Sequence, residues 1–126
     1  MHGHRIVLRL FSKIVSDELR GFIVWLPMVK GDSASSAAAL LSADKRFLIQ
    51  AWDPKGTAGQ AFSRTLNLPC PAWDVYLLYD RGIQWTDKDP PAPSLWMHQL
   101  SEHKVDQSLR LKESALLHAV SQRIKE

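Results

Sequence analysis

Residues 66–85, with the sequence LNLPCPAWDVYLLYDRGIQW, decide the expected fold of this chain. A Pro-Cys-Pro turn precedes residues 75–79, a β-branched and aromatic run that is typical of a strand. An Asp-Arg-Gly turn then leads into a short second apolar run at residues 83–85. Gly82 can supply the positive φ that such a turn needs. The stretch therefore predicts a β-hairpin that is entered through a proline turn.

The spacing of apolar residues predicts the elements on either side of this hairpin. A continuous apolar run at residues 22–26 indicates a buried strand, and residues 46–52 (RFLIQAW) predict another, which we expect to pair with it in parallel. Asp32 or Ser33 is the expected N-cap of the second helix, and Thr57 that of the third. The DPPAP run at residues 89–93 predicts a stiff, extended connector. Apolar residues recur at helical spacing over residues 5–16, 58–66 and 111–124, and an alanine-rich helix is predicted over 34–41.

Length and charge limit the class of protein. A chain of 126 residues predicts a single domain spanning residues 1–126. The net charge is +3 and both signs are spread along the sequence, which does not favour a nucleic-acid surface. No apolar run approaches the roughly 20 residues that span a bilayer, and charged residues interrupt the apolar N-terminal stretch. We expect a cytoplasmic protein that binds neither nucleic acid nor membrane.

Cysteine and histidine content argues against two kinds of site. Cys70 is the single cysteine, which excludes an internal disulfide and a thiolate zinc cluster. His98 and His103 are five residues apart, a spacing that suits neither one face of a helix nor one face of a strand. The sequence therefore predicts no metal site and no cofactor.

In its order of elements the chain resembles the thioredoxin-like proteins. FIVWLP is similar to the family's buried strand that ends in an aromatic residue before the active-site loop. TAGQAFSRTLNLPCPAWDVYLLYDRG is similar to its third helix, proline-led strand and glycine turn. GDSASSAAA, AWDVYLLY and PPAPSLWMHQL resemble a bacterial thioredoxin-like group without an assigned activity. The resemblance covers residues 5–126.

The resemblance implies a particular fold. It implies an α/β protein, a three-layer α/β/α sandwich around a central mixed sheet of about four strands, lacking the family's first strand. The family's proline before the late strand is cis, so the Cys70–Pro71 bond is expected to be cis and to border the loop at residues 29–33.

One difference from the family excludes its dithiol chemistry. Thioredoxin-type exchange needs two cysteines at C-x-x-C, and the corresponding loop here reads Val-Lys-Gly-Asp-Ser. What remains is a helix N-terminus beside a proline turn, which can bind an anion or a small polar ligand. The expected ligand-binding residues are Lys30, Asp32, Ser33, Cys70, Pro71 and His98.

Three functions stay open from the sequence. The first is a non-redox domain that binds a protein partner or a small ligand at the former active-site loop. The second is a monothiol enzyme with Cys70 as its catalytic residue in peroxide or mixed-disulfide chemistry. The third is a structural homo-oligomer. A dimer is expected because the apolar arc of residues 5–16 is wide and because Trp96 and Met97 offer a second contact.

Overall fold

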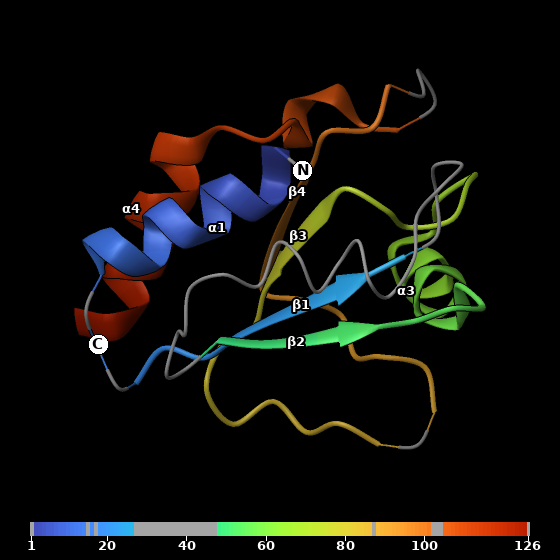
Figure 1. Cartoon of the computed structure of the whole chain (residues 1–126), viewed down its shortest axis with the longest axis horizontal. Helices are drawn as coiled ribbons and strands as arrows, with labels where there is room; N and C mark the ends of the chain where they lie inside the picture. Colours follow the sequence, from blue (N-terminus) through green and yellow to red (C-terminus); the bar gives the residue numbers. More distant parts are fainter. Residues whose placement is uncertain are drawn as a thin grey trace.

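The computed structural model describes residues 2–14, 16, 18–26, 48–86, 88–101 and 105–125. Within these ranges the protein is a mixed α/β domain (Figure 1). The predicted helix over 34–41 and the candidate residues Lys30, Asp32 and Ser33 lie outside the described residues. The elements in chain order are α1 (His2–Lys13), β1 (Gly21–Trp25), β2 (Leu48–Trp52), α3 (Thr57–Leu66), β3 (Val75–Leu78), β4 (Leu95–His98), the short 3₁₀ turn η1 (Gln107–Leu109) and α4 (Glu113–Lys125).

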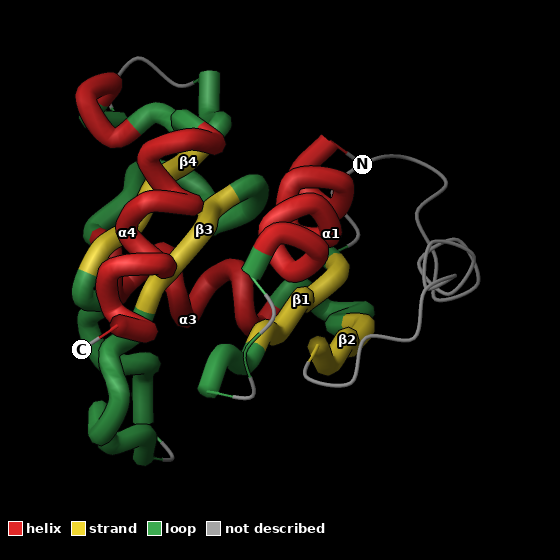
Figure 2. The backbone as a smooth tube through the Cα atoms, turned by 90° about the vertical axis from the view of Figure 1, so that its left-hand side faces the viewer, coloured by secondary structure: helices red, strands yellow, loops and turns green. Residues whose placement is uncertain are grey.

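The strands form two pairs. β1 and β2 pair in parallel, with Phe22 opposite Ile49, which confirms the predicted parallel pair. β3 and β4 pair antiparallel. In the described part of the chain the hydrogen bonds thus form two two-stranded sheets, in place of the predicted sheet of about four strands. In Figure 2 the β3–β4 pair is drawn to the left of the β1–β2 pair, and no ladder joins the two pairs among the described residues.

The partner of β3 corrects the predicted hairpin. Val75 pairs with His98 and Leu78 with Leu95, so the second strand is β4 and not residues 83–85. The run at 83–85 is too short to form a ladder of this length. Its Trp85 ring packs instead on the ring of Tyr79, with the centroids 4.9 Å apart. Gly82 does take a positive φ, of 90°, in the turn after β3.

Helices α1 and α4 lie side by side and contain the main apolar core (Figures 1 and 2). Amphipathic spacing on both helices places their apolar residues at this contact. Leu78 of β3 and Met97 of β4 pack against the same cluster, so the two helices cover the β3–β4 pair. The buried residues of the cluster are Ile6, Leu10, Leu116 and Val120.

A glycine allows α1 to approach the β1–β2 pair closely. A Cβ atom on Gly21 would lie 2.6 Å from Phe11 Cζ of α1 and 2.6 Å from Leu48 Cδ1 of β2. A side chain at residue 21 would therefore force Phe11 or Leu48 to shift. The glycine at the start of β1 leaves room for these two side chains.

Helix α3 begins and ends with residues in the left-handed conformation. Its N-cap is Gly56, and the carboxylate of Asp53 accepts the Ala58 N–H at 2.6 Å, so that Asp53 takes the capping role predicted for Thr57. At the other end Asn67 has a φ of 55°, and its N–H donates to the Arg64 carbonyl. The Leu68 N–H also donates to the Ser63 carbonyl at 2.9 Å, and these two hydrogen bonds are those of a Schellman motif. Both caps fix the helix beside the carboxyl ends of β1 and β2 (Figure 1).

Candidate functional site

The proline turn before β3 is held against α3. The Cys70–Pro71 bond is trans, which corrects the predicted cis bond. The trans isomer is the more stable form of an X–Pro bond by about 0.5–1 kcal/mol. The Ser63 hydroxyl donates to the Cys70 carbonyl at 2.7 Å, and the Ala72 N–H donates to the Gly59 carbonyl at 2.8 Å. These two hydrogen bonds fix the turn on the helix with the trans bond in place.

The carboxyl end of β1 reaches the same place. A Cβ atom on the buried Gly59 would lie 3.1 Å from Leu26 Cδ1 and 3.3 Å from the Ala72 carbonyl oxygen. Leu26 follows β1 directly, so the chain leaves this strand beside the proline turn. The free Cys70 is half-buried within that turn. The structure therefore brings together the end of β1, the middle of α3 and two of the predicted site residues, Cys70 and Pro71.

His98 lies in the interior and makes hydrogen bonds through both ring nitrogens. Its exposed fraction is 0%. Nε2 lies 2.8 Å from the Asp106 carbonyl oxygen, and Nδ1 accepts the Leu100 N–H at 3.1 Å. The ring is therefore the neutral tautomer that carries its proton on Nε2. His98 was predicted to bind a ligand, but its side chain does not face solvent. Both ring nitrogens already have hydrogen-bond partners, so neither is open to a metal ion.

The turn ends in an exposed pair of residues, Trp73 and Asp74. The Trp73 side chain is 40% exposed. Asp74 has a φ of 57°, a left-handed conformation in which aspartate is several-fold enriched over most residues. Its carbonyl accepts the Gln99 N–H at 3.0 Å. The backbone of this pair is thus fixed from both sides, because Ala72 is bonded to α3 and Asp74 to the residue after β4.

Two further side chains, Tyr76 and Gln99, form a polar cluster with Asp74, and neither was predicted as a site residue. The Tyr76 hydroxyl lies 3.2 Å from Asp74 Oδ1 and 3.0 Å from Gln99 Oε1. Asp74 precedes β3 and has a left-handed φ, so strand alternation gives no signal for this contact. Gln99 joins them only through the register of β3 and β4, which the hairpin prediction had wrong.

The environment keeps Tyr76 protonated. Burial raises the pKa of the Tyr76 phenol far above its ordinary value, and the neighbouring Asp74 carboxylate raises it further. The hydroxyl is therefore a neutral hydrogen-bond donor at neutral pH. It is not suited to act as a general base.

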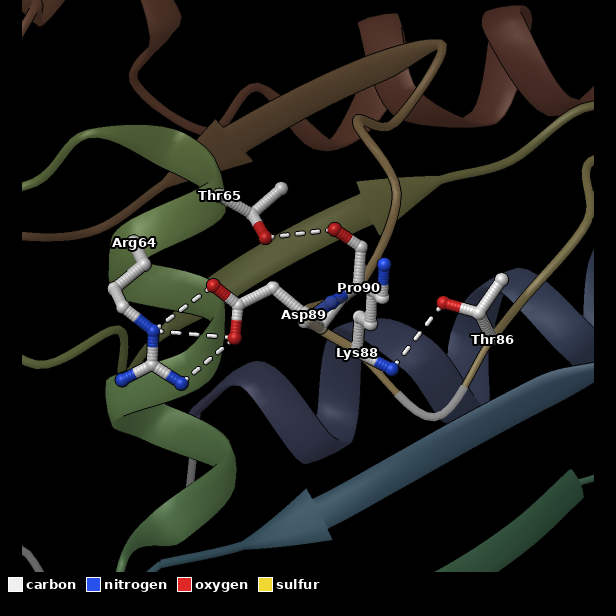
Figure 3. Close-up of polar contacts among 6 residues, drawn as sticks. All are labelled: Arg64, Thr65, Thr86, Lys88, Asp89 and Pro90. Atoms are coloured by element: carbon white, nitrogen blue, oxygen red, sulfur yellow. Dashed lines mark hydrogen bonds and ion pairs between the residues drawn. The ribbon is translucent and has the colours of Figure 1, made fainter.

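A second polar cluster fixes the DPPAP connector (Figure 3). Arg64 of α3 forms a bidentate ion pair with Asp89, the shortest distance being 2.7 Å, and Thr65 donates to the Pro90 carbonyl at 2.8 Å. The guanidinium lowers the pKa of the Asp89 carboxyl. Tyr79 donates to the Pro91 carbonyl at 2.8 Å. All these partners lie within the chain, so we assign this cluster a structural role.

In the described ranges no three His, Cys, Asp or Glu side chains gather as a metal-binding group. No described helix combines the length and apolarity that crossing a membrane requires. Comparison of the chain with models of known families, with curated proteins and with solved structures gave no match.

Proposed function

We propose that the protein is a thioredoxin-like domain without dithiol redox activity, which binds a protein partner or a small ligand at residues 70–74. The parallel β1–β2 pair and the proline turn on α3 support the thioredoxin-like part of this proposal. The single cysteine supports the non-redox part, because dithiol exchange needs a second thiol. A cytoplasmic location is part of the same proposal.

One observation carries the proposed site: Trp73 is exposed on a backbone that is already fixed. Its neighbour Ala72 is bonded to Gly59 at 2.8 Å, and Asp74 is bonded to Gln99 at 3.0 Å. A rigid aromatic side chain loses little conformational freedom on binding, which is why tryptophan is enriched among residues that dominate binding energy. A carboxylate beside it adds a polar contact that can orient the ligand.

The monothiol alternative depends on the reactivity of Cys70. A catalytic thiol needs an accessible thiolate, and Cys70 is half-buried. The Ser63 hydroxyl donates to its backbone carbonyl and so holds the residue in place. We expect slow reaction with a disulfide reagent in the native protein at neutral pH, and fast reaction after unfolding. Equally fast reaction of the native and unfolded protein would favour the enzyme instead.

A homodimer remains a prediction. The residues that suggested it take part in the fold, because Ile6 and Leu10 of α1 pack on α4 and Met97 packs on the same cluster. Trp96 is half-buried within β4. Sedimentation equilibrium at micromolar concentrations will decide between monomer and dimer.

Two tryptophan variants test the binding proposal. The protein is incubated with a random peptide library and with a small-molecule library, and the bound members are identified. Trp85→Ala is the matched control, because Trp85 is also exposed but lies outside residues 70–74 and packs on Tyr79. We expect Trp73→Ala to abolish the selected binding and Trp85→Ala to retain it. If neither library binds, or if Trp73→Ala binds like the wild type, the proposal is wrong.

A further inference from the structure

The buried ring of His98 holds the backbone after β4 in a way that depends on the charge of the ring. Nδ1 accepts the Leu100 N–H at 3.1 Å, and Nε2 donates to the Asp106 carbonyl at 2.8 Å. A protonated imidazole carries N–H groups on both nitrogens and accepts no hydrogen bond. A proton on Nδ1 would therefore set two donors against each other, beside a side chain that has no exposed surface.

The described groups around the ring leave this conflict in place. β3 contributes an apolar residue, Val75, at the position opposite His98. The Asp106 carboxylate would attract a positive ring, but it already accepts hydrogen bonds from the N–H and the hydroxyl of Ser108, at 3.0 and 2.7 Å. The Arg110 guanidinium would repel a positive ring, and it donates to the Leu100 carbonyl at 2.6 Å. Because these two charges act in opposite directions, the hydrogen bond at Nδ1 decides the outcome.

We propose that His98 is a pH-sensitive switch, in which uptake of a proton by Nδ1 in mild acid releases Leu100 from the fold. The Leu100 side chain is 2% exposed, so its release uncovers an apolar surface. The preceding residue, Gln99, donates its N–H to the Asp74 carbonyl at 3.0 Å. The opening therefore also loosens the backbone that presents Trp73. Only this last consequence rests on the proposed function.

The size of the effect follows from proton linkage. A histidine exposed to water is half protonated at about pH 6.5. When only the open form takes up the proton, the open population rises about tenfold between about pH 8 and pH 5.5. Aspartate and glutamate stay largely ionised over this range. The closed form is thus most stable at the upper pH and loses stability as the pH falls.

Amide hydrogen exchange measures the opening. The protection factor of the Leu100 amide, which is corrected for the chemical effect of pH on exchange, should fall at least about fivefold between these two pH values. His98→Asn removes the switch, because asparagine Oδ1 lies near the position of Nδ1 and accepts an N–H at either pH. Its Leu100 protection factor should change less than about twofold. His118→Asn is the matched control at an exposed histidine and should follow the wild type.

Imidazole ¹⁵N spectra of the wild type give a second measurement that needs no variant. In the closed form they should show a proton on Nε2 and none on Nδ1 at both pH values. Protons on both nitrogens of the closed form would overturn the inference. A constant Leu100 protection factor, or an equal loss in the wild type and in His98→Asn, would also overturn it. If the switch is confirmed and the library experiment fails, only the proposed site at residues 70–74 is lost.

Discussion

Replacing His98 with phenylalanine should destabilise the protein while it leaves the apolar helix contact intact. Phenylalanine fills a similar volume and keeps the ring that packs near Trp96, where the two ring centroids lie 5.7 Å apart. It removes both ring nitrogens. The Leu100 N–H then loses its acceptor in a region where the replaced side chain was fully buried, whereas the Asp106 carbonyl keeps the Leu109 N–H at 3.2 Å.

The expected magnitude follows from the Leu100 N–H. A buried donor or acceptor left without a partner costs about 1–3 kcal/mol. The variant should therefore lose about 1–3 kcal/mol in the free energy of unfolding. The hydrogen bond from the Leu111 N–H to the His98 carbonyl, at 2.7 Å, is unaffected because it involves the backbone alone. The damage should therefore be greatest at Leu100.

Urea unfolding followed by tryptophan fluorescence measures the change. His118→Phe is the matched control, since His118 is exposed on α4, and a surface substitution of this kind should stay within about 0.5 kcal/mol of the wild type. Amide hydrogen exchange at Leu100 should become faster in His98→Phe. A loss below about 1 kcal/mol with unchanged exchange at Leu100 would refute the argument that the His98 ring stabilises the Leu100 backbone.

Three further predictions concern other parts of the molecule. Gly21→Ala should cost about 1–3 kcal/mol in thermal or urea unfolding, because the new Cβ overlaps Phe11 and Leu48, and a neutral result would contradict the close approach of α1. Hydrogen bonds from Ser108 lower the pKa of Asp106, so the stability that its carboxylate contributes is present above about pH 4 and is lost as the pH falls through the lowered folded value. The Asp106→Asn variant should therefore show a shallower decline of unfolding free energy in acid, and an unchanged slope would disprove the assignment. In an insulin-reduction assay with dithiothreitol the protein should not exceed the reagent blank, and turnover that Cys70→Ser abolishes would overturn the non-redox proposal.

The local elements of this fold could be predicted from the sequence because each is specified by nearby residues. The apolar runs around Phe22 and Ile49 indicated buried parallel strands, and β1 and β2 pair in that way. Helical spacing indicated α1, α3 and α4, although the bounds of α1 differ by three residues at each end from the predicted 5–16. Capping was less predictable, since Asp53 and Thr57 both suit an N-cap and only the path of the loop decides between them.

The candidate site could be predicted only in part, because it depends on long-range register. The Cys70–Pro71 turn was recognised from its prolines, but its trans bond and its contact with Gly59 depend on how α3 packs. Gln99 reaches Tyr76 only because β4 pairs with β3. The burial of His98 requires the chain after β4 to fold back over it, and the Leu111 N–H then bonds to the His98 carbonyl. No local pattern around these residues encodes that return.

The anchored connection between β3 and β4 has a consequence for the order of folding. Closing an unstructured loop the length of residues 79–94 costs about 2.5 kcal/mol in chain entropy beyond a constant term. Arg64 and Thr65 of α3 hold Asp89 and Pro90 part of the way along this loop. A helix that has already formed can therefore divide one long closure into two shorter ones. We expect the β3–β4 pair to form after α3 in the folding reaction, with α3 acting as the template on which the second strand returns.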